Sequence, residues 1–150
     1  MPRTMGALRA IAVVGLLGIA VTHAAEASDK FEEVPYQGYL FIALIVACVA
    51  LATLSRVMSP TLWWTGVLAV SVVPCALFIV SRTAGLPSGE DDIGAWSEPM
   101  GIASLVFEAV TAIVAMRALQ ALAAASRVMA PPARRRTAGP SRRREPISGF

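Results

Sequence analysis

The sequence has few charged residues, a single histidine and only two cysteines. Charged residues make up 15% of the 150 positions, whereas soluble domains average about 25%. Cys48 and Cys75 lie in separate apolar stretches and form no CxxC pair. These shortages exclude zinc-finger and thioredoxin-type motifs. We interpret both cysteines as small buried thiols that pack between helices.

Signatures of catalysis are also lacking. The sequence shows no pair of nucleophile and base and no cluster of metal-ligating residues. It shows no phosphate-binding loop either, because Gly85, Gly89 and Gly94 are too scattered to form one. We therefore expect a protein that is not an enzyme and that holds no metal and no cofactor.

Apolar residues, by contrast, are abundant. They make up 56% of the chain, and the mean hydropathy is +0.64. A bilayer core of about 30 Å is crossed by roughly 20 mainly apolar residues in a helix. Residues 8–25, 37–55, 62–81 and 100–123 approach that length. The pattern predicts an all-α fold, a four-helix transmembrane bundle formed by one domain of residues 1–125.

Helix boundary signals separate the four segments. Ser59 followed by Pro60 is typical of a helix start, and Pro35 and Pro99 stand at the starts of the second and fourth segments. Gly85 is expected to end the third helix. These signals support four separate helices rather than fewer long ones.

Pro74 lies inside the third segment. A proline there removes one backbone hydrogen bond and is expected to kink the helix. The carbonyl that it frees, near Val70, needs another donor, and we expect Ser71 or water to supply it.

Basic residues gather on one side of the predicted membrane, which sets the orientation. Only Lys30 and Arg82 fall on the side that we predict to be outside. The other side collects Arg3, Arg9, Arg56, Arg117, Arg127, Arg134, Arg135, Arg136, Arg142, Arg143 and Arg144. The predicted outer loops carry the acidic residues Glu26, Asp29, Glu32, Glu33, Glu90, Asp91, Asp92 and Glu98. The positive-inside rule then predicts that both chain ends are cytoplasmic; the inverted topology is the alternative.

Aromatic residues agree with this layout. Five of them fall near the predicted membrane boundaries, where tyrosine and tryptophan are enriched. They are Tyr36, Tyr39, Trp63, Trp64 and Trp96. We expect them to lie at the bilayer interfaces.

The first segment has a second interpretation, as a cleavable signal peptide. A short basic start, an apolar run over residues 11–21 and the small residues Ala25 and Ala27 fit that pattern. Cleavage would leave three transmembrane helices in the same orientation.

Residues 126–150 change character and are rich in arginine and proline. With no apolar face to bury, this segment is predicted to be a disordered tail. Its arginines are expected to contact anionic lipid at the inner membrane surface. Nucleic-acid binding is the alternative that charge alone permits, but we expect none because no aromatic residues are interleaved with the arginines.

Glu108 is the main candidate for a functional residue. It lies about a third of the way into the fourth segment, and Gly101, Ser104, Thr111 and Ala115 share its helix face at steps of three and four. This small and polar face is expected to point into the bundle. Glu108 is interpreted either as a proton or cation site or as a protonated residue that forms an interhelical hydrogen bond to a serine or threonine.

His23 and Arg82 are further candidates at the outer side. His23 precedes Glu26 by three residues; a weak metal site is one interpretation, and an interfacial histidine bonded to a loop is the favoured one. Arg82 stands where basic residues are avoided, so we expect an acidic partner such as Asp91, Asp92 or Glu98.

Three elements together carry a resemblance: His23, the stretch DKFEEVPYQG at residues 29–38, and the pair SRTAGLP at 81–87 and WSEPMG at 96–101. With Ser104 to Glu108 they resemble a group of small uncharacterised four-helix membrane proteins of actinobacteria and related bacteria. The resemblance spans about residues 10–123. It implies a bacterial cell membrane location and no known reaction, and it favours retention of the first segment.

The topology brings the candidate residues to one end of the bundle. They are His23, Glu32, Glu33, Arg82, Trp96, Glu98 and, deeper, Glu108. Our first hypothesis is a non-enzymatic accessory or sensor subunit whose extracytoplasmic acidic face meets a membrane-protein partner or an ion. The second is an oligomeric proton or cation transporter that uses Glu108, and the third is a membrane oxidoreductase that uses Cys48 and Cys75.

Overall fold

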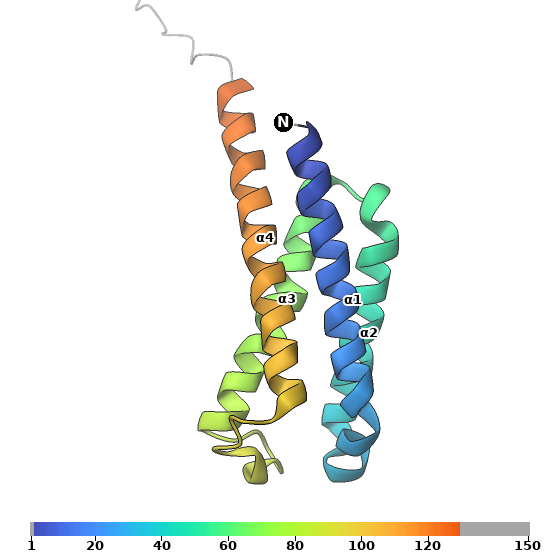
Figure 1. The fold of residues 1–150 in the computed structure, drawn as a ribbon, viewed down its shortest axis with the longest axis vertical. Helices are drawn as coiled ribbons and strands as arrows, with labels where there is room; N and C mark the ends of the chain where they lie inside the picture. The colour runs from blue at the N-terminus through green and yellow to red at the C-terminus, as the bar shows by residue number, and fades with distance from the viewer. Residues whose placement is uncertain (1, 130–150) are drawn as a thin grey trace, which may run out of the picture.

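The computed structural model describes residues 2–129, and in that part of the chain four long helices are joined by short connections (Figure 1). Its long helices are α1 (Pro2–Glu33), α2 (Pro35–Thr53), α3 (Pro60–Thr83) and α4 (Pro99–Met129). Short 3-10 turns, η1 (Leu54–Arg56) and η2 (Glu90–Asp92), lie between α2 and α3 and between α3 and α4. The predicted all-α, four-helix fold is confirmed.

The predicted boundary signals act as expected. Prolines occupy the first turns of α2 and α3, directly after Val34 and Ser59. Gly85 follows the end of α3 with a φ of +79°, a left-handed conformation that glycine adopts without strain. The ends of α2 and α3 lie within two residues of the predicted limits.

Helix α1 is longer than predicted, because it continues past residue 25 to Glu33. Residues 26–33 contain neither glycine nor proline, and Val34 N–H still donates to the Lys30 carbonyl at 2.9 Å. The expectation that Glu32 and Glu33 lie in a loop is therefore wrong. Both lie on the last turn of α1, and only Val34 separates α1 from α2.

The helices form two hairpins, α1–α2 and α3–α4, joined along α1 and α4. Close approach of α1 to α4 depends on Gly15, where a Cβ atom would lie 2.0 Å from Thr111 Oγ1. Figure 1 shows that α1 begins and α4 ends at the same end of the bundle. We call this the arginine end; the opposite end, formed by residues 26–37 and 82–98, we call the acidic end.

The core of the arginine half contains Trp63 and Trp64, both 0% exposed. Trp63 Nε1–H donates to the Leu51 carbonyl at 2.7 Å, and the Arg9 guanidinium lies 5.1 Å from the Trp63 ring centroid. Both tryptophans lie in the first turns of α3, but their side chains are buried in the bundle. The hydrogen bond of Trp63 ties α3 to α2. Their expected position at a bilayer interface stays a prediction.

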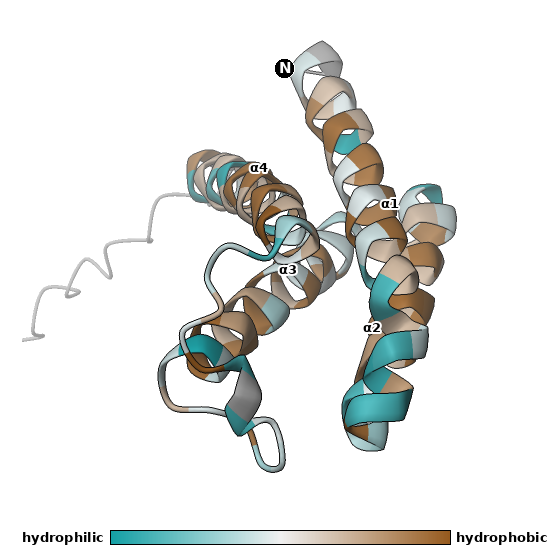
Figure 2. Cartoon of the chain, turned by 60° about the horizontal axis from the view of Figure 1, so that its bottom comes forward, coloured by the Kyte–Doolittle hydropathy of each residue, from teal (hydrophilic) through white to brown (hydrophobic). Residues whose placement is uncertain are grey.

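The distribution of polar and apolar side chains is that of a membrane protein. All four long helices are long and apolar enough to cross a bilayer. Large apolar side chains such as Val14, Val46 and Val106 are exposed, whereas Ser71, Glu108 and Thr111 are buried. Figure 2 shows hydrophilic residues gathered towards the acidic end of α1 and the loop between α3 and α4. Lipid, rather than water, suits such a surface.

Three further expectations concern the end of α4, the tail and Ser71. Helix α4 continues to Met129, past the predicted domain limit at residue 125. The rest of the predicted tail, residues 130–150, lies outside the described part of the chain. Within α3, Ser71 Oγ donates to the Val67 carbonyl at 2.8 Å, so Ser71 is not the donor to the carbonyl near Val70 that Pro74 frees.

Candidate functional site

The two hairpins enclose a cavity of about 350 Å³ in the acidic half of the bundle. At the arginine end α2 and α3 are held together through Trp63 and Leu51. Towards the acidic end, side chains of α2 such as Leu40 and Leu44 and side chains of α3 such as Val73 and Leu77 line the space between them. The walls are therefore apolar, and the polar groups lie at the mouth and the floor.

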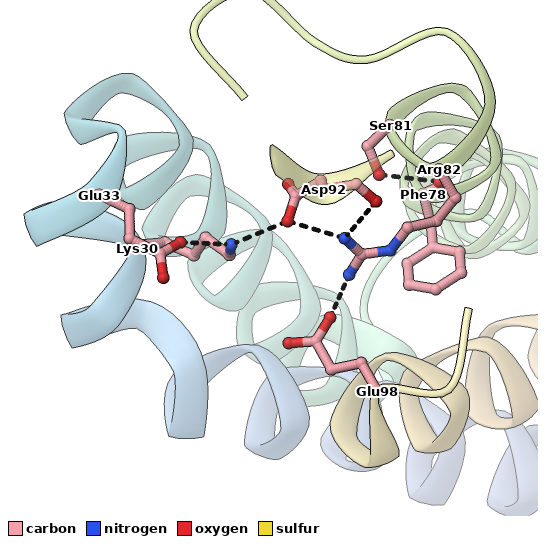
Figure 3. Close-up of polar contacts among 7 residues, drawn as sticks. All are labelled: Lys30, Glu33, Phe78, Ser81, Arg82, Asp92 and Glu98. Carbon is pink, nitrogen blue, oxygen red and sulfur yellow. Dashed lines mark hydrogen bonds and ion pairs between the residues drawn. The ribbon is translucent and has the colours of Figure 1, made fainter. Parts of the chain in front are cut away.

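An ion-pair network crosses the mouth of the cavity (Figure 3). Arg82, only 5% exposed, forms an ion pair with Asp92 at 2.7 Å and another with Glu98. The same guanidinium donates to the Asp92 main-chain oxygen at 3.2 Å. Lys30 lies 3.5 Å from Asp92 and 2.6 Å from Glu33. Because Lys30 belongs to α1 and Arg82 to α3, the network connects the two hairpins.

Aromatic rings support the arginine of this network. The Arg82 guanidinium carbon lies 4.8 Å from the Phe78 ring centroid, one turn earlier on α3, a cation–π contact. Trp96 packs edge-on against Phe78, with centroids 6.3 Å apart. The predicted acidic partners of Arg82 are thus present, and its burial is compensated by charge and by stacking.

The floor of the cavity is formed by Glu108 and its neighbours. Glu108 is 1% exposed, and the Ser104 hydroxyl donates to its Oε1 at 2.7 Å. Ser104 lies one turn earlier on the same helix, so the expected interhelical bond to serine or threonine is wrong. Across the interface, His23 Nε2 of α1 lies 3.8 Å from Glu108 Oε1.

The orientation of His23 follows from its second ring nitrogen. Nδ1 lies 2.9 Å from the Ile19 carbonyl oxygen; because a carbonyl only accepts, Nδ1 carries a proton. Phe41 of α2 packs on the ring at 4.7 Å. Nε2 is therefore directed at Glu108. We expected His23 to form a hydrogen bond with a loop, but its ring contacts the Ile19 carbonyl of its own helix and faces the interior of the bundle.

The structure brings together most of the predicted site residues. Arg82, Glu98 and, through Lys30, Glu33 belong to the network at the mouth, and His23 and Glu108 meet at the floor. Trp96 is half-exposed beside the network. Glu32 is exposed on the outer side of α1 and does not line the cavity.

Sequence reasoning missed Glu26, Lys30 and Gln37 as cavity residues. Glu26 lies beside Glu98, and Gln37 is 5% exposed with no partner for its Nε2 among residues 2–129. The spacing of His23, Glu26 and Lys30 by three and four would have placed them on one helix face. That signal was hidden because α1 was expected to end at residue 25.

No group of three or more potential metal ligands occurs among the residues that the structure describes. Cys48 and Cys75 are free thiols. Nothing in these residues calls for a cofactor, and the absence of one stays a prediction.

Comparison with known proteins adds no further assignment. No family model matches the chain, and no curated protein or solved structure matches it. The resemblance to the actinobacterial four-helix group therefore stays a prediction, and functional inference depends on the geometry of the site.

Proposed function

We propose that this protein is a small non-enzymatic accessory or sensor subunit of a bacterial cell membrane, and that it acts through its acidic end. The observation that carries the proposal is a cavity that has a polar mouth at this end and an apolar closure towards the other. Such a shape suits binding of a ligand or of a partner's side chain.

The closure consists of tightly buried side chains. Leu16, Ile19, Cys48 and Val67 are all 0% exposed. The nearby hydroxyl of Thr111 donates to the Phe107 carbonyl of its own helix at 2.6 Å, so it offers no free donor. Towards the arginine end the core continues with apolar side chains such as Ala12, Trp63 and Ala118. This favours binding over transport through a single copy.

The network at the mouth supplies a means of signalling. Asp92 holds Arg82 of one hairpin and Lys30 of the other. A ligand or partner that competes for Asp92 or Lys30 weakens the link between the hairpins, and their separation at the acidic end can then change. Binding outside is thereby coupled to helix positions inside the membrane.

The test of this function is site-specific photo-crosslinking in native membranes. A photoreactive residue at Glu32, exposed at the acidic end, is expected to give a discrete adduct with a membrane-protein partner. The same residue at Val57, 77% exposed at the arginine end, is the matched control and is expected to give none. Equal adducts at both positions, or no adduct at Glu32, would contradict the proposal. A Glu32 adduct of twice the chain's mass would identify a homo-oligomer.

Oligomeric proton or cation transport is the second candidate, and one observation favours it: Glu108 Oε2 is buried without a hydrogen-bond partner in the described part of the chain. Transport requires additional copies of the chain, because in a single copy buried apolar side chains close the space between Glu108 and the arginine end. If the protein carries a proton flux into liposomes and Glu108→Gln abolishes that flux, transport is the function and the sensor proposal is wrong.

We further propose that the arginine end, and with it both chain ends, lies in the cytoplasm. Ser97 and Ser59 are exposed in the loops at opposite ends. In a Cys48→Ala/Cys75→Ala background, Ser97→Cys is expected to react with a membrane-impermeant maleimide in intact cells. Ser59→Cys is expected to react only after permeabilisation. The reversed labelling pattern would show the inverted topology.

A further inference from the structure

The floor of the cavity holds a carboxyl oxygen with no partner. Ser104 occupies Glu108 Oε1, whereas Oε2 has no hydrogen-bond partner within residues 2–129. Buried acceptors without partners are uncommon in folded proteins. Glu108 is among the residues that line the cavity, so a bound molecule that reaches this side chain can supply the missing donor.

No cation of the described chain neutralises the Glu108 carboxylate at close range. His23 Nε2 stands 3.8 Å from Oε1, beyond hydrogen-bond distance. Arg82 is held by Asp92 and Glu98, and Lys30 by Glu33 and Asp92. A positive group that pairs with Glu108 would therefore have to come from a bound molecule.

The walls above the floor favour hydrocarbon. Leu40 and Leu44 face the cavity from α2, and Val73 and Leu77 face it from α3. The volume of about 350 Å³ lies within the usual range of small-molecule sites, roughly 300–1,000 Å³. The other lining carboxylates, Glu26, Asp92 and Glu98, belong to the mouth. At the floor, the apolar walls and the single carboxylate of Glu108 cannot supply the several oxygen ligands that an inorganic cation needs. The ligand body is therefore organic.

The mouth selects for positive charge. The acidic end carries eight acidic residues against two basic ones, Lys30 and Arg82. Such an imbalance raises the local concentration of cations and repels anions.

From these features we infer that the cavity binds an organic cation with a compact apolar body and one ammonium group, with Glu108 as its counter-ion. The ammonium group donates to Glu108 Oε2, and the body lies against the leucine and valine side chains of α2 and α3. The inference rests on the proposed function and names the class of ligand that the cavity takes.

Calorimetric titration of the full-length protein in lipid nanodiscs tests this inference. The probes share one apolar body: 1-adamantylamine, 1-adamantanol and 1-adamantanecarboxylate. We expect saturable binding of the amine, about tenfold weaker binding of the alcohol and none of the carboxylate, because a charge-assisted hydrogen bond contributes roughly one such factor or more.

Two matched variants locate the effect. Glu108→Gln keeps the shape and the acceptor for Ser104, and it is expected to weaken amine binding about tenfold or more. Glu32→Gln makes the same charge change at the same end but outside the cavity, and is expected to alter affinity by less than about twofold. Leu44→Trp fills the cavity from α2 and is expected to weaken amine and alcohol alike. Circular dichroism checks that each variant is folded.

Equal amine affinity in the native protein and in Glu108→Gln overturns the inference. Alcohol binding as tight as amine binding also overturns the cationic class, while it leaves the cavity as a binding site and the proposed function intact. If no probe binds saturably, the inference fails, and the crosslinks at Glu32 decide the proposed function separately.

Discussion

Arg82→Gln is expected to lower the free energy of unfolding by about 3 kcal/mol, the lower end of the range for breaking a buried ion pair from one side. The substitution leaves Asp92 and Glu98 without their common cation. The Asp92 and Glu98 side chains are 20% and 34% exposed, so water solvates part of the unpaired charge. The expected loss of stability therefore lies at the lower end of the range for buried ion pairs. Unfolding in mixed detergent micelles, followed by circular dichroism, measures the change.

Arg117→Gln is the matched control for this prediction. Arg117 is exposed on α4, so the same chemical change is expected to alter stability by less than about 0.5 kcal/mol. Arg82→Lys should recover only part of the loss, because an ammonium group cannot hold two carboxylates in the planar geometry of a guanidinium. Equal effects of the Arg82 and Arg117 changes would mean that the network at the mouth does not hold the hairpins together.

Gly15→Leu is expected to destabilise the bundle by about 3 kcal/mol, the upper end of the range for overpacking a core. A Cβ at Gly15 would lie 2.0 Å from Thr111 Oγ1 and 3.2 Å from Thr111 Cβ. Rotation of the hydroxyl relieves the first clash but not the second, so α1 must move away from α4. The same unfolding titration measures the loss.

Gly6→Leu is the control, because a Cβ at Gly6 meets nothing within 4 Å. Here the expected change is stabilising and below about 1 kcal/mol, since leucine is the better helix former. Displacement of α1 by Gly15→Leu also moves His23 away from Glu108. Both the affinity for the amine and the free energy of unfolding are therefore expected to fall in this variant. Full stability in Gly15→Leu would contradict the close approach of the two helices.

The coupling between stability and ligand binding follows from the architecture. The α1–α4 interface carries both halves of the floor, His23 and Glu108, while the mouth depends on Lys30, Arg82 and Asp92. Changes at the interface therefore act on the floor, and changes in the network act on the mouth. Under the proposed sensor function, a charged ligand or partner at the acidic end would act through the separation of the two hairpins.

The number of helices and their approximate limits were predictable from the sequence because they depend on local chemistry. Apolar segments of membrane length, prolines at helix starts and Gly85 after α3 each act within a few residues of the chain. The separation of arginines from acidic residues is likewise a property of sequence order, and it survives in the bundle as two ends of opposite charge.

Only the tertiary structure decided which side chains meet. The continuation of α1 to Glu33 placed Glu26 and Lys30 beside the cavity. The rotation of α4 about its axis directed the Glu108 side chain towards His23, whereas the hydrogen bond between Ser104 and Glu108 lies within α4. The burial of Trp63 and Trp64 depended on the packing of α3 against α1 and α2. Helix rotation and hairpin separation arise from packing between distant segments, so hydrophobic periodicity and boundary signals, which are local, do not specify them.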